Sequence, residues 1–320
     1  MDDNNSMISI IMPVYNAESY ISEAIESVCK QNYADWELLI VNDGSSDHSP
    51  EIIEKYAQKD LRIKVFHRKN EGVSMARNFA LNQVRGEYVT FIDSDDVYHI
   101  DRLKKLLQVF EQHKKCDVVF SRHREFRGKL YVNEERDQGK IYISYDDIPK
   151  KVISDSNNHF VWNMMIKAEI AQKEKFSQIR FAEDFCYIRD CAMHCREMAI
   201  LDETLYFYRR DNENAMTSHF FSEKYVSDYM KLVENIYGFC KNHKLDDEFY
   251  KKMVAHEYAQ NSMRIRKSTS YYAKFVTCMN DEIFREGIQF ADASQCTKFE
   301  RLLFNMVKHK IYFLFAFWIW

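Results

Sequence analysis

Short apolar runs alternate with amphipathic segments over the first third of this chain. Runs typical of buried strands cover residues 8–15, 36–43, 63–68, 87–93 and 117–123. Segments with apolar residues at helical spacing lie between them, at 19–31, 49–60, 74–84 and 101–113. Strands and helices that alternate in this way form a parallel sheet with helices on both faces. The sequence therefore predicts an α/β fold with a mostly parallel sheet flanked by helices.

Local sequence also indicates where the first two helices begin. Asn16 or Ser19 is expected to cap the first helix, because a short polar side chain accepts hydrogen bonds from the free N–H groups of a first turn. The second helix opens with Ser49, Pro50 and Glu51. This order predicts Ser49 at the N-cap and Pro50 at the first helical position.

Polar residues stand where the predicted strands end. Tyr15, Asp43, Arg68 and Asp93 each lie at the carboxyl end of an apolar run. In an open α/β sheet, ligands bind beyond the carboxyl ends of the strands. We therefore expect these strand ends to form one binding rim.

The sequence FIDSDD at 91–96 holds three carboxylates, Asp93, Asp95 and Asp96, directly behind an apolar run. While the chain stays extended, Asp93 and Asp95 point to the same side. Two carboxylates on one side suit Mg²⁺ or Mn²⁺, and a cation would offset their repulsion. The alternative is an acidic loop that caps the helix starting near Asp101.

Composition narrows the class of protein. A chain of 320 residues, 46% of them hydrophobic, allows two domains or one large domain with an appendage, and a sizeable core. The net charge of −4 and the lack of a dense basic block in the first two thirds argue against nucleic-acid binding. The residues from 126 to 215 follow no regular pattern, whereas the last hundred have helical spacing.

Cysteines and the N-terminus indicate a cellular compartment. Cys186, Cys191 and Cys195 are expected to be buried free thiols of a reducing cytosol, with a zinc site as the alternative. The N-terminus, MDDNNSM, is the opposite of a secretory signal. No run reaches the roughly 18 to 20 apolar residues of a spanning helix. We therefore expect a cytoplasmic protein.

Four motifs occur in order and at distances that suit strand–helix–strand units. They are PVYNAESYI (13–21), VNDGSSD (41–47), NEGVSMARNFAL (70–81) and FIDSDD (91–96). This ordered set resembles the family 2 glycosyltransferases, inverting enzymes of the GT-A (Rossmann-like) fold that use nucleotide-diphosphate sugars. The resemblance covers residues 7 to about 125 and continues more loosely to about 220.

The resemblance also implies a division of the chain. Residues 1–125 would be the nucleotide-sugar-binding half of the GT-A domain. Residues 126–220 would be the acceptor-binding half with the catalytic base, and 221–320 a helical C-terminal extension.

By this resemblance, the first three motifs bind the nucleotide. Asp43 would accept a hydrogen bond from the N3–H group of uracil. Asn70 and Arg77 would hold the nucleotide as well, Arg77 through the base or a phosphate. A wall against the base would consist of Pro13, Val14 and Tyr15. The alternatives are that Tyr15 is an interfacial core residue and that Arg77 forms a surface ion pair.

The resemblance assigns the fourth motif to the sugar and the metal. Asp93 would contact the ribose, Ser94 is counted among the donor contacts, and Asp95 would coordinate Mn²⁺ or Mg²⁺ bridging both phosphates of the donor. Asp96 is expected to support these residues or to cap a helix. A metal acting as a Lewis acid stabilises the negative charge of the leaving nucleoside diphosphate.

In the family the catalytic base is the Asp of a Glu-Asp pair at the start of a helix. Here IRFAEDFCYIRDCAMH (179–194) supplies Glu183 and Asp184. The resemblance implies that Asp184 is the base and that Glu183 orients the acceptor. A helix N-terminus keeps a carboxylate ionised, whereas burial and a like charge raise its pKa. The alternative is that both carboxylates only cap the helix.

Further candidates lie nearby. LYFYRRDNENAMTSH (205–219) is similar to a tyrosine-arginine segment of the family, and its polar side chains would reach the diphosphate as a closing loop. Those side chains are Arg209, Arg210, Ser218 and His219. Trp162 would stack on an acceptor sugar, with a core position as the alternative.

The chain ends in FNMVKHKIYFLFAFWIW, whose last ten residues are apolar and include five Phe or Trp. Such a segment suits the interface of a bilayer, with Lys308 and Lys310 toward headgroups, so we expect a peripheral protein on the inner face of the cell membrane. Packing into the protein's own core or against a partner copy is the alternative.

These observations together predict a metal-dependent inverting transferase. It would move a hexose or N-acetylhexosamine from a UDP-sugar to a saccharide acceptor, expected to be lipid-linked and to belong to bacterial O-antigen, capsule or lipooligosaccharide synthesis. The alternatives are a protein or teichoic-acid glycosyltransferase, and a non-catalytic nucleotide-sugar-binding subunit of a polysaccharide assembly complex. A Rossmann dehydrogenase is excluded because PVYNAES, not a glycine-rich turn, follows the first strand.

Overall fold

The computed structural model describes residues 6–130, 139–145, 148–149, 160–179 and 182–212, together with residues 231, 232, 235, 238, 239, 242 and 243. The chain divides into two compact units. The first contains Met1–Gln178 and Ala182–Asn212, and the second contains Ile179–Phe181 and Glu213–Trp320. In the second unit the described residues from 231 to 242 are helical, as the sequence predicts. The expected boundaries at 125 and 220 stay a prediction.

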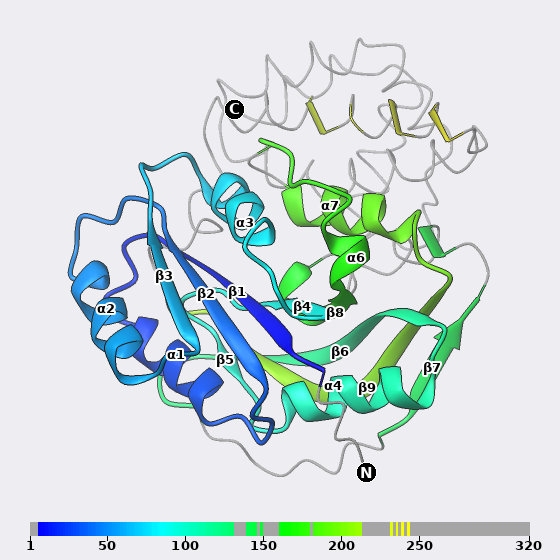
Figure 1. Ribbon diagram of the computed structural model, residues 1–320, viewed down its shortest axis with the longest axis horizontal. Helices are drawn as coiled ribbons and strands as arrows, with labels where there is room; N and C mark the ends of the chain where they lie inside the picture. The colour runs from blue at the N-terminus through cyan, green and yellow to red at the C-terminus, as the bar shows by residue number, and fades with distance from the viewer. Residues whose placement is uncertain are drawn as a thin grey trace, which may run out of the picture. The chain divides into compact units, whose positions relative to one another are not determined.

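A single mixed sheet forms the centre of the first unit (Figure 1). Among the residues that the structure describes, it has nine strands, in the order β3-β2-β1-β4-β8-β6-β9-β5 with β7 beside β9. The strands are β1 (Ile8–Val14), β2 (Trp36–Asn42), β3 (Ile63–His67), β4 (Tyr88–Phe91), β5 (Val97–Tyr98), β6 (Cys116–Phe126), β7 (Ile141–Ser144), β8 (Met164–Lys167) and β9 (Glu197–Arg209).

The α/β fold class is confirmed, and the sheet combines a continuous parallel block with a mixed part. Strands β3, β2, β1 and β4 are all parallel. Beyond them, β8 is antiparallel to both β4 and β6, and β9 is parallel to β6 but antiparallel to β5 and β7. The alternating pattern that predicts parallel strands ends near residue 125, so pairing further along depends on contacts distant in sequence.

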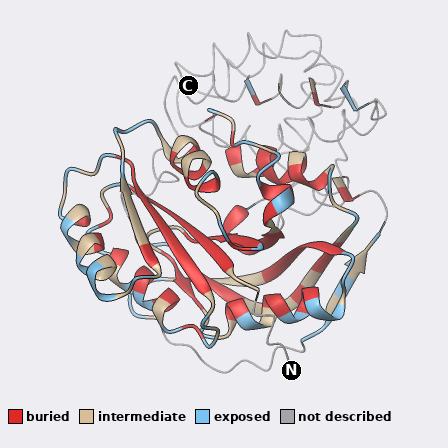
Figure 2. Cartoon of the chain, viewed as in Figure 1, coloured by how far each residue is buried: buried red, intermediate tan, exposed pale blue. Residues whose placement is uncertain are grey.

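Helices cover both faces of the sheet (Figure 1). One face packs on α1 (Ile21–Cys29), α2 (Ser49–Lys59) and α4 (Arg102–Gln112). The other packs on α3 (Val73–Leu81), α6 (Ala168–Ala171) and α7 (Glu183–Ala192). Strands β1, β2 and β4 are buried along their whole length between these layers (Figure 2). Their near-continuous apolar sequences follow from burial on both faces.

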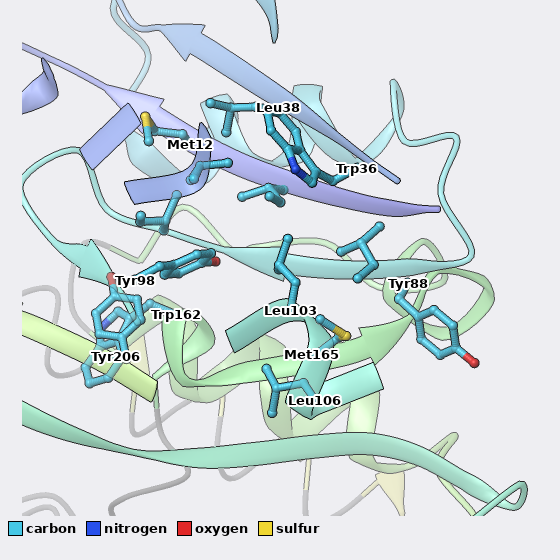
Figure 3. Packing of buried hydrophobic residues seen from close by; sticks show 14 of the residues in the cluster. Met12, Trp36, Leu38, Tyr88, Tyr98, Leu103, Leu106, Trp162, Met165 and Tyr206 are labelled. Atoms are coloured by element: carbon cyan, nitrogen blue, oxygen red, sulfur yellow. The ribbon is translucent and has the colours of Figure 1, made fainter. Parts of the chain in front are cut away.

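The core on the face of α1 and α4 is rich in large side chains (Figure 3). Met12 and Leu38 from the parallel strands pack there with Leu103 and Leu106 of α4. Trp162 belongs to the same cluster and is 4% exposed. It lies in the short 3₁₀ turn η2 (Val161–Asn163) that leads into β8. The core position is therefore the one that the structure shows for Trp162.

Both predicted helix caps are wrong. Helix α2 begins at Ser49 itself, with His48 at the N-cap. The Ser49 hydroxyl accepts the backbone N–H of Ala17 at 2.8 Å and so ties the second helix to the loop after β1. Asn16 lies in the left-handed region at φ 49° and accepts the N–H of Ser46 at 2.8 Å. In both cases the side chain that local sequence predicts as a helix cap accepts a hydrogen bond from a loop distant in sequence instead.

The expected free thiols are confirmed where the structure describes them. Cys186 and Cys191 are buried and Cys195 is half-buried, and none of the three is in a disulfide. No helix among the described residues is long and apolar enough to cross a bilayer. The C-terminal aromatic segment at 311–320 lies outside the residues that the structure describes.

A buried carboxylate anchors β6 to β8 and β9. The Asp117 side chain is 1% exposed and accepts hydrogen bonds from Lys167 Nζ at 2.9 Å and Arg196 Nη2 at 2.7 Å. Burial disfavours the charged form, but the hydrogen bonds from Arg196 and Lys167 outweigh it and lower the pKa of Asp117 to about 2. Its contribution to stability is therefore complete above a pH of roughly 4 and is lost as pH falls through the folded pKa.

We expect Asp117→Asn to lower the free energy of unfolding at pH 7 by about 2 kcal/mol, the value of this pKa shift. Urea unfolding at pH 7 and at pH 3 measures the change, and the deficit should shrink at the lower pH. Glu111→Gln, at an exposed position of α4, is the matched control and should leave the unfolding energy unchanged. An equal deficit at both pH values would contradict the electrostatic origin.

Candidate active site

The carboxyl ends of β1, β2 and β4 meet at one edge of the sheet because these strands are parallel neighbours. Pro13 and Val14, the last residues of β1, are buried in the sheet. Tyr15 follows them and is 53% exposed, so it is not an interfacial core residue. Its ring is available as an aromatic surface at this edge.

Asp43 organises the loops beside Tyr15. The side chain is buried, and its oxygens accept the backbone N–H groups of Glu71 at 2.9 Å and Gly72 at 2.8 Å. These N–H groups precede α3, whose N-cap is Gly72. Each carboxylate oxygen has a second lone pair, so Asp43 retains the capacity to accept one more donor.

Asn70 is exposed in the same loop. A close approach of two backbones fixes its position. A Cβ atom on Gly44 would lie 2.9 Å from the Asn70 nitrogen, and Gly44 has a φ of 75° that favours glycine. The glycine of VNDGSSD therefore brings the loop after β2 against the loop before α3.

The end of β4 carries the acidic cluster. Asp96 is fully buried and accepts the hydroxyl of Tyr206 at 2.6 Å and the Arg209 N–H at 2.8 Å. Burial, together with the charges of Asp95 and Asp93, raises the pKa of Asp96 well above its usual value. Helix α4 has Asp101, not Asp96, at its N-cap, so Asp96 supports the cluster from within and does not cap a helix.

Asp95 and Asp93 are the carboxylates nearer the surface. Asp95 Oδ2 accepts Asn212 Nδ2 at 2.7 Å, and burial followed by the charge of Asp93 raises the pKa of Asp95. Ser94 between them is half-buried. The raised pKa values show that the charged forms of these carboxyls are destabilised by burial and by one another, a condition that a divalent cation would relieve.

The donor set fits a cation that takes most of its ligands from elsewhere. Among the described residues, no three His, Cys, Asp or Glu side chains form a group that could hold a metal. Mg²⁺ and Mn²⁺ need only one or two protein carboxylates when a phosphate ligand and water supply the rest. Asp95, with Asp93 beside it, would hold such an ion, and among the described residues the cysteines form no group that could hold zinc.

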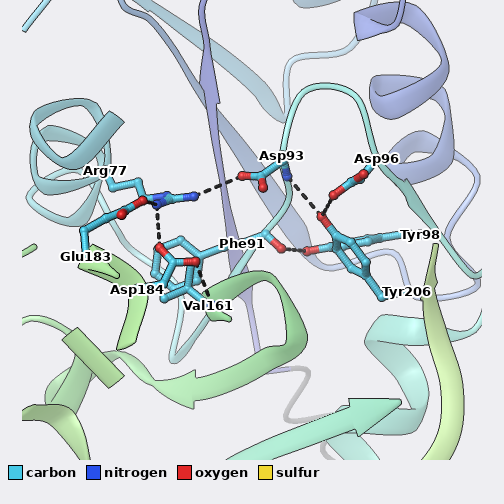
Figure 4. A network of polar contacts seen from close by, with 9 residues as sticks. All are labelled: Arg77, Phe91, Asp93, Asp96, Tyr98, Val161, Glu183, Asp184 and Tyr206. Atoms are coloured by element: carbon cyan, nitrogen blue, oxygen red, sulfur yellow. Dashed lines mark hydrogen bonds and ion pairs between the residues drawn. The ribbon is translucent and has the colours of Figure 1, made fainter. Parts of the chain in front are cut away.

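Arg77 joins the acidic strand to the Glu-Asp pair of α7 (Figure 4). Its Nη2 donates to Asp93 Oδ1 at 3.0 Å, and its Nη1 donates to Asp184 Oδ1 at 2.6 Å and approaches Glu183 Oε1 at 3.4 Å. The guanidinium is buried, so this is not a surface ion pair. Burial disfavours its charge, but Asp184, Asp93 and Glu183 outweigh that effect and raise the pKa of Arg77.

Glu183 and Asp184 occupy the first two positions of α7, as predicted. Asp184 Oδ2 also accepts the backbone N–H of Val161 at 3.2 Å. Burial raises the pKa of both carboxyls, and Arg77 opposes this rise in both. The pKa of Glu183 reaches about 8. At pH 7 Glu183 therefore carries a proton, and Asp184 is the carboxyl that makes the shorter contact with Arg77.

Of the four side chains predicted to contact the diphosphate, the structure describes two. Arg209 is buried at the end of β9, where it pairs with Glu23 and donates Nε–H to the Asp95 carbonyl at 2.7 Å. Arg210 is more exposed and pairs with Glu125 at 2.7 Å. A role of either in binding the donor stays a prediction. Ser218 and His219 lie outside the described residues.

Three contributors to the site were not among the residues predicted from sequence. Tyr206 donates to Asp96, Asn212 donates to Asp95, and the Val161 N–H donates to Asp184. Tyr206 and Asn212 flank the arginines of the segment 205–219, so their position was a usable signal. Val161 contributes only its backbone N–H. Almost any residue could supply that group, so the residue type does not predict this role.

Comparison with known sequences identifies the family. The chain matches Glycosyl transferase family 2 over residues 9–196, a span that contains every residue of the Arg77 network. It is 33% identical over 220 residues to the uncharacterized glycosyltransferase EpsJ of Bacillus subtilis. The aligned region covers 66% of this chain and 63% of that protein. It is 26% identical over 234 residues to glycosyltransferase GlyG of Streptococcus pneumoniae, covering 68% of this chain and 75% of that protein.

Solved structures agree on the fold. The crystal structure of Staphylococcus aureus TarS residues 1–349 in complex with UDP-GlcNAc superposes with a TM-score of 0.71 at 21% identity, covering 95% of this chain and 88% of that one. The mannosyltransferase PcManGT of Pyrobaculum calidifontis, in complex with GDP-Man and Mn²⁺, gives a TM-score of 0.54 at 14% identity over 97% and 86% of the two chains. With its GT-A fold and its match over 188 residues, this chain belongs to glycosyl transferase family 2.

Proposed function

We propose that this protein transfers a hexose or N-acetylhexosamine from a UDP-sugar to a hydroxyl group of a saccharide acceptor, with inversion at the anomeric carbon and with a divalent cation. The observation that carries the proposal is the Arg77 network. It joins Asp93, at the donor end of β4, to Asp184 at the N-terminus of α7. A binding module needs no ionised carboxylate at this place, whereas a transferase needs a base there.

Asp184 is the group that takes the acceptor proton. It is ionised, oriented at both oxygens by Arg77 and Val161, and close to the donor end of the sheet. As the acceptor oxygen attacks C1 of the donor sugar, its proton moves to Asp184 and the bond from C1 to the phosphate oxygen breaks. UDP leaves with the bonding electron pair, and the new C–O bond forms on the opposite face.

The donor half of the site supports a uridine nucleotide. Tyr15 offers an exposed ring and Asp43 a buried carboxylate with acceptor capacity, which suits a base that has an N–H group to donate. The Staphylococcus aureus TarS complex holds UDP-GlcNAc in a chain of the same fold. Asp95, beside Asp93, would hold Mn²⁺ or Mg²⁺, which as a Lewis acid stabilises charge on the leaving diphosphate.

The proposed acceptor is a saccharide, and its carrier is a separate question. A lipid-linked saccharide of a bacterial surface polymer was expected from the aromatic C-terminal segment. That segment is outside the described residues, so membrane binding and the pathway stay predictions.

Hydrolysis of UDP-sugars tests the proposal. With Mn²⁺, the protein should release UDP from at least one of UDP-Glc, UDP-Gal, UDP-GlcNAc and UDP-GalNAc, and EDTA should abolish the release. Asp95→Ala should reduce the stimulation by Mn²⁺ by a factor of about 100, because the carboxylate that neutralises the cation is lost. A coupled assay for UDP measures both results.

This experiment has two controls, one donor and one variant. GDP-mannose serves as the non-cognate donor and should not be hydrolysed. Asp35→Asn replaces a carboxylate outside the site and should leave the metal response unchanged. The proposal fails if calorimetry with UDP and Mn²⁺ shows no binding to the wild-type protein.

A further inference from the structure

A column of aromatic rings lies next to the proposed base. Phe160 stacks on Trp162 with ring centroids 4.8 Å apart and an angle of 15° between the rings. Trp162 stacks in turn on Tyr206 at 4.5 Å and Tyr208 at 5.5 Å, with angles of 22° and 19°. Trp162 is therefore stacked against three nearly parallel rings, from Phe160 at the N-cap of η2 and from two tyrosines of β9. The inner members of this column are held in the core, as Trp162 and Tyr206 are both buried.

Phe160 is the outer ring of this column. It is 40% exposed, although it is a large apolar side chain fixed against a buried tryptophan. An isolated exposed phenylalanine needs no explanation, but one that ends an ordered stack presents a rigid flat surface to solvent. The His123 ring is nearly perpendicular to the Trp162 ring, with ring centroids 4.9 Å apart. Burial lowers the pKa of His123, so its imidazole is neutral at pH 7.

The position of Phe160 relative to Asp184 is fixed by the backbone. Val161 directly follows Phe160, and its N–H group donates to Asp184 Oδ2 at 3.2 Å. The peptide unit between Phe160 and Val161 is thus bonded to the base itself. A molecule resting on the Phe160 ring would lie on the residue whose following peptide N–H binds Asp184.

We propose that Phe160 is the stacking surface for the pyranose ring of the acceptor saccharide. This inference rests on the proposed function and names the substrate class of the acceptor side. The C–H groups on one face of a pyranose are slightly positive and apolar, and the face of an aromatic ring is negative and apolar, so the two attract. Hydroxyl groups at the ring edge stay free, and one of them can reach Asp184.

The proposal separates a cyclic sugar from other hydroxyl compounds. A ribitol phosphate or a serine side chain has no flat apolar face to place on Phe160. The Trp162 ring, which sequence analysis assigned to the acceptor, acts from beneath by holding Phe160 flat. Phe160 itself is not part of any sequence motif.

Binding of simple glycosides to the protein–UDP–Mn²⁺ complex tests this inference. The probes are the methyl glycosides of glucose, galactose and N-acetylglucosamine, with ribitol 5-phosphate as the acyclic comparison. Saturation-transfer NMR should detect at least one glycoside on the wild-type complex. Phe160→Leu should weaken that binding about tenfold, which corresponds to about 1.4 kcal/mol, while Phe160→Tyr should retain it.

Further measurements keep the outcome specific. Phe160→Leu should bind UDP with Mn²⁺ as the wild type does, because nucleotide binding does not need the acceptor. Tyr142→Leu is the matched control, since Tyr142 is 50% exposed on β7 and pairs with Ile200, toward the opposite end of β9 from Tyr206. It should not change glycoside binding.

Three outcomes would overturn the inference about Phe160. If the wild type still binds UDP, they do not affect the proposed function. The first is that no glycoside gives saturation transfer with the wild type. The second is that Phe160→Leu binds glycosides as well as the wild type does. The third is that ribitol 5-phosphate competes equally well in both proteins. If the wild type does not bind UDP at all, the proposed function itself is refuted.

Discussion

Asp184→Asn is expected to lower kcat for sugar transfer by about a thousandfold, within the range that loss of a general base produces. Asparagine has nearly the same shape and still accepts the Val161 N–H, but it cannot take up the acceptor proton. Binding of UDP and Mn²⁺ should change little, because Asp184 lies on α7 and not at the donor end of β4. Steady-state kinetics and calorimetry with UDP measure the two quantities separately.

The adjacent carboxyl provides a matched control. Since the pKa of Glu183 is about 8, the group is protonated at pH 7, and glutamine reproduces its neutral form. Glu183→Gln should therefore keep most of the activity at pH 7. The two proteins should diverge only as pH rises through 8, where the wild-type group ionises. If Glu183→Gln were as inactive as Asp184→Asn at pH 7, the roles of the two carboxyls would have to be exchanged.

Arg77→Met is expected to lower the free energy of unfolding by about 3–5 kcal/mol, the cost of leaving buried charges without their partner. The methionine approximates the volume of the arginine side chain, so the loss reports the charges of Asp93 and Asp184 and not a cavity. Urea unfolding at pH 7 measures it. Activity should fall as well, because Arg77 opposes the effect of burial on Asp184 and its removal lets the pKa of Asp184 rise.

This pKa effect has a definite sign. In Arg77→Met, Asp184 should be protonated at neutral pH, and activity should recover in part as pH rises. A merely structural loss would leave the shape of the pH profile unchanged. At high pH, where Asp184 ionises in Arg77→Met, the double variant with Asp184→Asn should be more stable than Arg77→Met alone, since one unpaired charge is removed. Equal stability of the single and double variants would show that the ion pair does not hold α7 to the sheet.

Much of the first 125 residues could be predicted from sequence. Buried strands such as 8–14 and 36–42 are long apolar runs, and the helices between them have clear spacing, so local pattern and final structure agree. The strand ends at Tyr15, Asp43 and Asp93 were found because parallel strands must bring such residues to one edge. Glu183 and Asp184 came from motif resemblance, and the start of α7 confirms their place in the fold.

Other features depend on partners far away in sequence. Ser49 was read as a cap, yet its hydroxyl accepts the N–H of Ala17, 32 residues earlier. The resemblance assigns Arg77 to the nucleotide, which stays a prediction, and the structure shows that it pairs with Asp184, 107 residues later. Arg209 was assigned to the diphosphate, and its guanidinium lies among protein groups. A polar side chain has several potential partners, and only the folded chain decides which is near.

The sequence by itself determined the parallel strands, the residues at their carboxyl ends and the family to which the chain belongs, because apolar periodicity and ordered motifs are local properties. Only the tertiary structure decided how the charges are shared. Arg77 balances Asp93 and Asp184 at once, Glu183 keeps its proton, and Phe160 stacks on Trp162 next to the Val161 N–H that binds Asp184. Each of these depends on burial and on distances across the sheet, which no stretch of sequence contains.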